Sequence, residues 1–354
     1  MLKTIIITVT LALSCYLAKA SNMKLLSFYQ TQYSEKSPVI DGSVSDPCWK
    51  QAVEYKSYYV YFDPNPGPGK LKTSLRLLWN QQGLFVAIIN YDKNIDKIKA
   101  VNTTRDNSKM WTDDCAELYF DPTADSVGYT KFIINALGTI SDMRQIDAAV
   151  KLNEWSASGL EVKTSINKEA WIIEMFIPWD DLGKMPSNGS LWKFCHVRYA
   201  WSSGKFIGVT SSPGGNYNNI GDFGFLYFSR SKDTKLENIA QIIKSKAAQP
   251  WYLELQGKFI TCENDKVEAS SLKDIFMAKL KSCEKLCSQI RALKDKNSDT
   301  PKIKLLAKYQ LTIEKIRKLP NPAFNDVQKL SKLLAKLDEL YWQMKFENLL
   351  TEIR

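Results

Sequence analysis

The sequence predicts an antiparallel, jelly-roll-like β-sandwich followed by a small α-helical bundle or coiled-coil domain. Short runs rich in β-branched and aromatic residues, separated by glycine- and proline-containing turns, recur through most of the chain. Beyond about residue 232 these turns give way to apolar residues at the three- and four-residue spacing of helices. A chain of 354 residues is long for a single core and suits two such domains.

Residues 1–20 are expected to be a secretory signal peptide. Lys3 precedes a mostly apolar run that ends at Ala18-Lys19-Ala20, where small residues occupy the two positions that a signal peptidase recognises. The run is too short to span a bilayer, and no later stretch of the sequence approaches the roughly 20 apolar residues that spanning requires. The mature protein is therefore expected to be secreted, extracellular or periplasmic, without a transmembrane segment.

Residues 21–232 are expected to form the β-sandwich. The β-rich runs predict strands at residues 55–62, 73–79, 84–91, 116–120, 131–137, 160–166, 171–177, 192–201 and 224–228. Turn-forming pairs such as Gln82-Gly83 separate them. No long amphipathic helix interrupts the series, which argues against a parallel α/β sheet.

The segment from Lys109 to Pro122 is the most informative about function, because a tryptophan and an acidic cluster lead directly into an alternating strand. Successive side chains of a strand point to opposite faces, so Glu117 and Tyr119 are expected to share one face. Trp111 lies on the approach to this strand. A flat aromatic ring beside hydrogen-bonding side chains is typical of a sugar-binding site. A half-buried core tryptophan and solvated turn carboxylates are the structural alternative.

An ordered series of motifs resembles the family 9 carbohydrate-binding modules. The series spans about residues 36–229 and comprises Pro38–Gly42 with Asp46 and Trp49, Leu77–Asn80, Leu84–Ala87, Trp111–Asp121, Glu174–Trp179 and Phe223-Gly224. No single motif is specific, and the resemblance depends on their order. It implies a β-sandwich that holds the reducing end of a glycan between two aromatic rings, often carries structural calcium, and has no catalytic activity of its own.

The resemblance also implies four carbohydrate-binding residues. Trp111 matches the first aromatic residue. Tyr217, in a segment whose composition is that of a loop, falls where the family places its second aromatic residue, normally a tryptophan. Glu117 matches a carboxylate that accepts hydrogen bonds from sugar hydroxyls, and Asn135 matches a polar residue that lines the same pocket.

One position departs from the family pattern. Ile133 stands where the family has an arginine, so a charged bidentate donor is missing, and the affinity or the ligand is expected to differ. Lys131 lies on the same strand face and could partly substitute, although an ordinary surface lysine is the favoured interpretation.

The sequence gives weak indications of metal, disulfide or haem sites. Asp113 and Asp114 could contribute to a calcium site, but adjacent carboxylates before a strand more often face water. Six cysteines follow the expected signal peptide and allow disulfides without indicating a pairing, and no Cys-x-x-Cys pair suggests zinc. His196 is the single histidine, and Met110 or Met175 could serve as a second axial haem ligand only by coincidence. A buried structural role is favoured for His196.

Residues 233–354 are expected to be α-helical. Ser271 and Asp274 resemble a helix-start capping box. Three apolar stripes follow, at Phe276, Leu280, Cys283, Cys287 and Ile290, at Leu306, Tyr309, Ile313 and Ile316, and at Val327, Leu330, Leu334, Leu337, Tyr341 and Met344. An internal bundle is favoured over a coiled coil with a partner or a second copy.

The favoured function is a secreted, non-catalytic protein that binds an oligosaccharide or polysaccharide and needs no cofactor. Most of the net charge of +10 belongs to the helical part, where lysines commonly form the solvated face. Nucleic acid is not expected, because the chain has no recognised binding motif. A glycoside hydrolase using Asp113, Asp114 and Glu117 is one alternative, and it would need two carboxyl groups about 5 to 10 Å apart. An assembly protein acting through the helical tail is the other.

Overall fold

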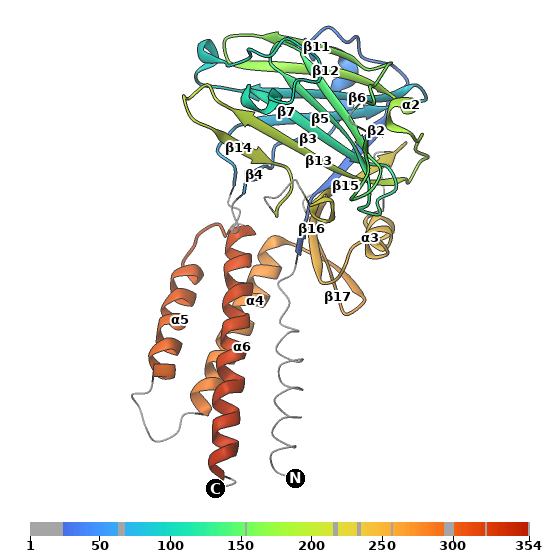
Figure 1. Cartoon of the computed structure of the whole chain (residues 1–354). Coiled ribbons are helices and arrows are strands. Elements are labelled where there is room, and N and C mark those ends of the chain that lie inside the picture. The colour runs from blue at the N-terminus through green and yellow to red at the C-terminus, as the bar shows by residue number, and fades with distance from the viewer. Residues whose placement is uncertain are drawn as a thin grey trace. The chain divides into compact units, whose positions relative to one another are not determined.

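The computed structural model describes residues 24–62, 68–152, 154–214, 219–231, 235–255, 258–293, 301–322 and 324–352. These residues form two compact units, the first comprising Leu25–Ala247 and the second the region from Ala248 onward together with Lys24 (Figure 1). The expected signal peptide, residues 1–20, lies outside the described residues. Among the helices that the structure describes, none combines the length and apolarity needed to cross a membrane.

The first unit is a curled β-sheet in which fourteen strands are described (Figure 1). Its main path runs β10 (Lys151–Leu152), β9 (Ile140–Gln145), β8 (Tyr129–Asn135), β7 (Cys115–Asp121), β13 (Leu191–Ala200), β15 (Gly224–Ser229), β2 (Phe28–Tyr33), β5 (Thr73–Trp79), β6 (Gly83–Tyr91), β12 (Ala170–Pro178) and β11 (Glu161–Ile166). Off this path, β3 (Glu54–Tyr55) pairs with β5, and β14 (Ile207–Thr210) pairs with β13 and β4 (Tyr59–Val60). Strand pairs are antiparallel except that β2 is parallel to both β15 and β5. The predicted mainly β, sandwich-like fold is confirmed.

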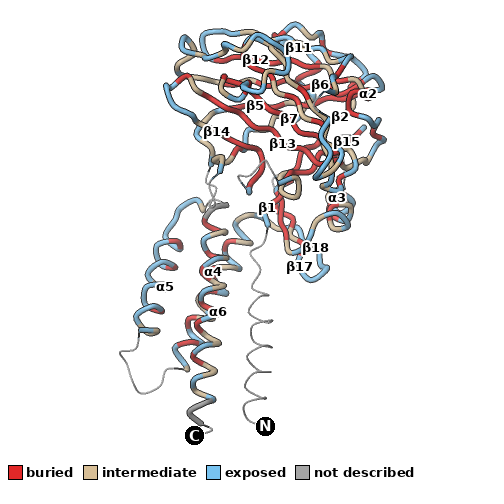
Figure 2. The backbone as a smooth tube through the Cα atoms, viewed as in Figure 1, coloured by how far each residue is buried: buried red, intermediate tan, exposed pale blue. Residues whose placement is uncertain are grey.

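The main hydrophobic core lies on the inner face of this sheet, to which every second side chain of a strand points, and the central strands are buried along most of their length (Figure 2). It includes Leu75, Leu77 and Trp79 of β5, Ala116, Leu118 and Phe120 of β7, Trp171, Ile173, Met175 and Ile177 of β12, and Trp192 and Phe194 of β13. The expected division of side chains between the two faces of β7 is therefore confirmed.

A buried carboxylate fastens the N-terminal motif to the sheet. Glu174 of β12 accepts hydrogen bonds from the backbone N–H of Gly42 (2.8 Å) and Ser43 (3.1 Å), and from Trp49 Nε1 (2.8 Å). Gly42 has φ of +85°, and a Cβ there would lie 3.1 Å from the backbone of Thr164, so the turn requires glycine. Trp49 is 2% exposed and packs in the interior.

The strand predictions differ from the structure in two respects. Residues 55–62 were expected to be one strand, but this region contains the two short strands β3 and β4. The strands β2, β9, β10 and β14 were not predicted, because their sequences lack an apolar run or a clear alternation. In β2, for example, Gln30, Thr31 and Gln32 are all buried although all are polar.

The second unit combines a β-meander with helices. The strands β16 (Trp251–Leu255), β17 (Lys258–Glu263) and β18 (Lys266–Ser270) pair antiparallel in chain order. The helices α4 (Leu272–Ala292), α5 (Pro301–Arg317) and α6 (Phe324–Glu352) follow, whereas α3 (Leu236–Lys244) belongs to the first unit. The sequence did not indicate the meander within the expected helical region.

The helices α4, α5 and α6 form a bundle with one core. Ser271 and Asp274 make the predicted capping box at the start of α4. The buried side chains include Phe276, Leu280, Cys283, Cys287 and Ile290 of α4, Leu306, Ile313 and Ile316 of α5, and Val327, Leu330, Leu337 and Met344 of α6. The predicted stripes thus meet within this unit, as expected for an internal bundle.

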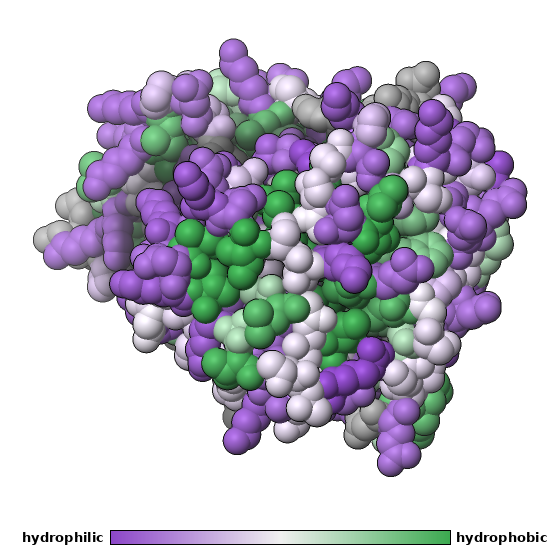
Figure 3. All heavy atoms as spheres, turned by 90° about the horizontal axis from the view of Figure 1, so that it is seen from above, coloured by the Kyte–Doolittle hydropathy of each residue, from purple (hydrophilic) through white to green (hydrophobic). Residues whose placement is uncertain are grey.

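The surface is mixed in character. Seen from above, apolar side chains gather in patches among predominantly hydrophilic ones (Figure 3). In the first unit the exposed large apolar side chains include Val39, Val101, Leu137 and Ile166. Single exposed apolar residues are normal on globular proteins, so they do not by themselves mark a site.

Candidate functional site

Two buried carboxylates organise the approach to β7. Asp114 Oδ2 accepts a hydrogen bond from the backbone N–H of Lys99 (2.7 Å), and Asp114 Oδ1 accepts one from that of Trp201 (3.0 Å). Asp113 Oδ2 accepts one from the backbone N–H of Asn102 (2.9 Å). Both aspartates are fully buried, so the expectation that they face water is wrong. Burial raises the pKa of the Asp114 carboxyl.

Asn135, at the end of β8, belongs to the same network. Its Nδ2 donates to Asp113 Oδ2 (2.9 Å) and to the carbonyl oxygen of Asn102 (2.8 Å). Its Oδ1 accepts from the backbone N–H groups of Leu137 (3.1 Å) and Thr139 (2.9 Å). The side chain is fully buried, and all of these polar groups have protein partners. Asn135 therefore ties the turn after β8 to Asp113.

Trp111 lies in η3 (Met110–Thr112), a single turn of 3-10 helix directly before Asp113. Half of its surface is exposed (50%), whereas Met110 is buried. Trp201 Nε1 donates to the Trp111 carbonyl oxygen (3.1 Å), and the two ring centroids lie 6.3 Å apart at 49°. The indole of Trp111 is thus presented to solvent from a backbone that is held on both sides.

Glu117 lies on the outer face of β7, opposite the core, and is paired with two neighbours. Tyr119 Oη donates to Glu117 Oε2, and Lys131 Nζ lies 3.3 Å from Glu117 Oε1. Lys131 Nζ also lies 5.1 Å from the centroid of the Tyr119 ring. Lys131 is therefore part of a charged cluster rather than an ordinary surface lysine. We call Glu117, Tyr119 and Lys131 the outer-face triad.

The departure from the family pattern lies beside this triad. Ile133 is the register partner of Glu117 across β7 and β8, and Lys131 is the partner of Tyr119. Ile133 packs against the apolar cluster on this face, which includes Cys115 and Val197. The missing arginine would thus have stood next to Glu117.

The four predicted binding residues have different positions. Trp111 is exposed, Glu117 is almost completely buried beside Lys131, and Asn135 is fully buried and joined to the approach to Trp111 through Asp113. Tyr217 lies outside the described residues. The structure thus joins Asn135 to the segment that carries Trp111 through Asp113, whereas the contacts of Glu117 are to Tyr119 and Lys131.

Two aromatic residues at this site were not predicted. Trp201 directly follows β13, and its ring centroid lies 5.1 Å from that of Phe206. Phe206 is 39% exposed. The signal that could have revealed them is the short polar turn Ser202–Lys205 with an aromatic residue on each side.

The fold and this arrangement define a β-sandwich binding domain. Its exposed indole, Trp111, lies just before β7, and the outer face of β7 carries the paired carboxylate of Glu117. The family described as carbohydrate family 9 binding domain-like matches residues 40–229, which is more than half of the chain. The protein belongs to this family, so the resemblance seen in the sequence is confirmed.

Individual relatives are distant. The chain is 25% identical over 185 residues to endo-1,4-beta-xylanase A of Thermotoga neapolitana, and the match covers 49% of this chain but only 15% of that enzyme. Two solved structures are of a family 9 carbohydrate-binding module from Caldicellulosiruptor kristjanssonii. The cellotriose complex is 19% identical, with coverage of 58% of this chain and 95% of that chain and a TM-score of 0.43. The glucose complex is 20% identical, with coverage of 59% and 99% and a TM-score of 0.44.

The residues considered for haem, disulfides and metal ions have the following surroundings. His196 is fully buried, its Nδ1 lies 2.6 Å from Tyr58 Oη, and burial lowers its pKa to about 3. The six cysteines among the described residues are buried, and no disulfide forms between them. Over the same residues, no three histidine, cysteine, aspartate or glutamate side chains gather to hold a metal ion, and structural calcium stays a prediction.

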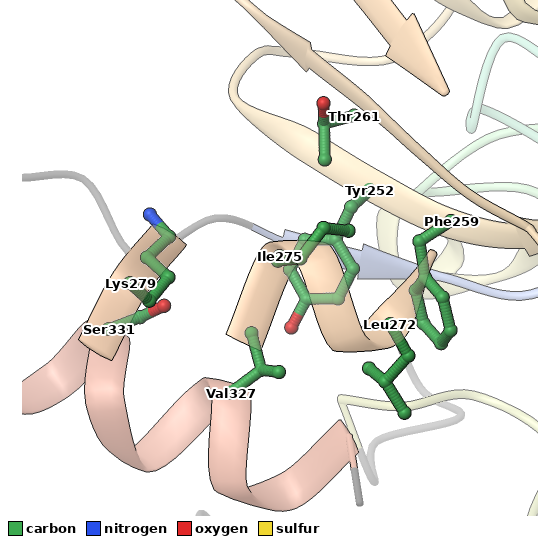
Figure 4. Close-up of a pocket in the computed structure, with 8 residues that line it drawn as sticks. All are labelled: Tyr252, Phe259, Thr261, Leu272, Ile275, Lys279, Val327 and Ser331. Atoms are coloured by element: carbon green, nitrogen blue, oxygen red, sulfur yellow. The ribbon is translucent and has the colours of Figure 1, made fainter. Parts of the chain in front are cut away.

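The second unit contains a small pocket between its meander and its helices (Figure 4). Tyr252, Phe259, Thr261, Leu272, Ile275, Lys279, Val327 and Ser331 line it. Its lining is mainly apolar, with Lys279 as its only charged member. It lacks the paired polar groups that the first unit places around Glu117.

Proposed function

We propose that this protein is a secreted, non-catalytic carbohydrate-binding protein in which Trp111 stacks on a sugar ring and the outer-face triad bonds to sugar hydroxyls. Membership of the family supports carbohydrate as the ligand class. The observation that carries the proposal is the exposure of the Trp111 indole on a fixed backbone. A large indole that is 50% exposed, on a backbone fixed by Trp201 and the aspartate network, is available for stacking without rearrangement.

The outer-face triad supplies complementary hydrogen-bonding chemistry. Glu117 is an acceptor, Lys131 is a donor, and Tyr119 is both. Glu117 and Tyr119 are each 2% exposed, so a sugar hydroxyl meets the triad at Lys131, whose ammonium group donates to it while staying paired with Glu117. Lys131 then takes part of the role that the arginine has in the family.

Asn135 acts in this proposal as a positioning residue. It bonds to Asp113 and to the carbonyl oxygen of Asn102, and it holds the segment that leads to Trp111. Asn135 thereby affects the sugar through the placement of the indole. We further propose that Tyr217 supplies the second ring, so that the end of a glycan, its reducing end, is held between two aromatic side chains.

Calorimetric titration with reducing oligosaccharides, and with the same sugars reduced to alditols, tests the proposal. The alditols are expected to bind more weakly, because the closed terminal ring that stacks on Trp111 is lost. Trp111→Ala is expected to weaken binding at least about tenfold, from the loss of stacking and buried apolar area. Met277→Ala, which removes an exposed apolar side chain of α4, is the matched control and should bind as the wild type does.

Two outcomes would overturn the proposal. Binding of no sugar from a broad panel, or unchanged binding by Trp111→Ala, would show that the site is elsewhere. Release of reducing sugar from a polysaccharide, with its loss in Glu117→Gln, would establish hydrolysis instead of binding alone.

A further inference from the structure

A row of aromatic side chains extends the exposed surface of Trp111. The centroid of Trp111 lies 6.3 Å from that of Trp201, and the centroid of Trp201 lies 5.1 Å from that of Phe206. Trp111 is 50% exposed and Phe206 is 39% exposed, while Trp201 between them is partly exposed. We call Trp111, Trp201 and Phe206 the aromatic row.

The row is fixed by polar contacts at its centre. The backbone N–H of Trp201 donates to Asp114 Oδ1 (3.0 Å), and its Nε1 donates to the carbonyl oxygen of Trp111 (3.1 Å). Lys99 Nζ lies 5.2 Å from the centroid of Trp201. The backbone and the indole Nε1 of Trp201 are therefore both held by hydrogen bonds, and the cationic hydrogen-bond donor of Lys99 lies beside its ring.

Phe206 is held by packing. Its centroid lies 5.3 Å from that of Tyr199. Its ring lies against Gly208, where a Cβ would come within 2.9 Å of Phe206 Cζ. The absence of a side chain at position 208 thus leaves room for the ring. Phe206 is a rigid exposed ring rather than a side chain that rotates freely in solvent.

We propose that Trp201 and Phe206 form a second subsite, which receives the sugar rings that follow the one stacked on Trp111. This inference rests on the proposed function, and it adds that the ligand is an extended oligosaccharide chain rather than a single terminal sugar. Successive pyranose rings each offer a C–H face, so a linear chain can contact several aromatic rings in turn.

The composition of the surface around the row favours a glycan over a protein partner. The turn between Trp201 and Phe206 contains Ser203, Gly204 and Lys205, all exposed, and Lys99 is exposed on the other side. The row thus has polar edges along this turn and at Lys99, and beyond Phe206 it continues to Tyr61, whose ring centroid lies 5.9 Å from that of Phe206. A stable protein interface needs a wider buried area with an apolar centre.

Titration with a ladder of oligosaccharides from one to six sugars tests this subsite in the full chain. The wild type is expected to bind a tetrasaccharide roughly three- to tenfold more tightly than a single sugar. Phe206→Leu keeps an apolar side chain but removes the flat ring, and it should abolish this gain, measured against the affinity for a single sugar, which contacts Trp111 alone. Met185→Ala, an exposed apolar position in the same unit, is the control and should retain the gain.

The outcomes separate this inference from the proposed function. If Trp111→Ala abolishes binding of every sugar but Phe206→Leu keeps the full dependence on chain length, the second subsite is refuted and the first stands. If short sugars fail to bind the wild type, the proposed function falls, and the inference falls with it. If sedimentation shows self-association that Phe206→Leu removes, the row is a contact between copies of the chain, and the glycan subsite is refuted. Thermal unfolding of Phe206→Leu confirms that the variant is folded.

Discussion

The two faces of strand β7 are both buried, but they are buried by different kinds of interaction. On the inner face, Leu118 and Phe120 belong to the main core of the sandwich. On the outer face, Glu117 is 2% exposed and is held by Tyr119 and Lys131. Apolar contact on the inner face is non-directional, whereas the outer face depends on specific partners. Burial alone therefore does not distinguish a residue that supports the fold from one that serves the site.

The energetic difference between the faces indicates their roles. Burying an apolar side chain of the size of Leu118 contributes about 1.5 to 3 kcal/mol to folding. A buried ion pair contributes little on balance, because desolvation of both charges offsets their attraction. The pairing of Glu117 with Lys131 is thus a weak source of stability. Under the proposed function, the pair holds a hydrogen-bond donor in place for a polar ligand.

Leu118→Ala should mainly lower stability, whereas Tyr119→Phe should mainly weaken binding. Leu118→Ala should lower the free energy of unfolding by about 2 to 5 kcal/mol, because it leaves a cavity in the core. The folded fraction should bind sugar with unchanged affinity. Tyr119→Phe should cost only about 1 kcal/mol, from one lost hydrogen bond, but should weaken binding. Urea unfolding and titration of both variants measure this, and equal effects on both quantities would break the contrast between the faces.

The pH dependence of stability tests a polar group on the inner face. His196 of β13 is the register partner of Leu118, and burial lowers its pKa from 6.5 to about 3. The unfolded chain takes up a proton as the pH falls below about 6.5, but the folded protein does not. Above about pH 6.5 the buried His196 therefore does not lower the free energy of unfolding. Towards pH 3 this free energy falls progressively, by about 1.4 kcal/mol for each pH unit well below 6.5.

Comparison of the wild type with His196→Gln isolates this effect. His196 is the single histidine of the chain, so no other histidine titrates in this range. Burial raises the pKa of Asp114 and Asp142, and these carboxyls favour the folded state as the pH falls, but they are present in both proteins. Between about pH 6.5 and 4.5 the wild type should lose roughly 2 to 3 kcal/mol relative to the variant. Parallel stability curves for the two proteins would contradict the prediction.

A smaller effect is expected for Lys131→Met on the outer face. The substitution leaves the buried Glu117 with Tyr119 as its described partner, and it should lower the free energy of unfolding by about 1 to 2 kcal/mol. In the double variant with Glu117→Gln, part of this loss should be recovered, because no buried charge remains unpaired. Lys163→Met, an exposed position on β11, is the control and should change stability little. Additive losses in the double variant would show that the two side chains do not interact.

The sequence predicted the apolar parts of the molecule well, because they follow simple periodicities. The alternation in β7 and the helical stripe from Phe276 to Ile290 both correspond to buried positions. The strand β2 escaped prediction, because its polar residues are buried by neighbours that are distant in sequence. The meander β16–β18 also lay within a region expected to be helical.

At the site, the positions of residues on the strand were easier to predict than their hydrogen-bond partners. Trp111 was correctly placed before β7, and Glu117 and Tyr119 were correctly placed on one face. The burial of Asp113 and Asp114 depends on backbone N–H groups at Lys99, Asn102 and Trp201, which no local pattern reveals. Sequence spacing identifies which residues share a strand face, but hydrogen bonds between distant segments emerge only from the folded chain.

The smallest expected effect comes from restoring an arginine at position 133. Ile133 lies opposite Glu117 in the ladder and is only partly buried, so a long side chain can extend towards the surface. Ile133→Arg adds a planar, bidentate donor for sugar hydroxyls and should increase affinity about two- to threefold. The gain is small because the new guanidinium group also attracts Glu117 and competes with Lys131 for it.

Ile133→Met is the matched control, since it lengthens the side chain without adding a donor, and it should leave affinity unchanged. The gain should disappear when Glu117→Gln is combined with Ile133→Arg, because the arginine is then no longer oriented by the carboxylate. Titration with one oligosaccharide across the three variants measures this. An equal gain with and without Glu117 would mean that the arginine acts through the net charge of the surface, and that the outer face of β7 does not contact the sugar.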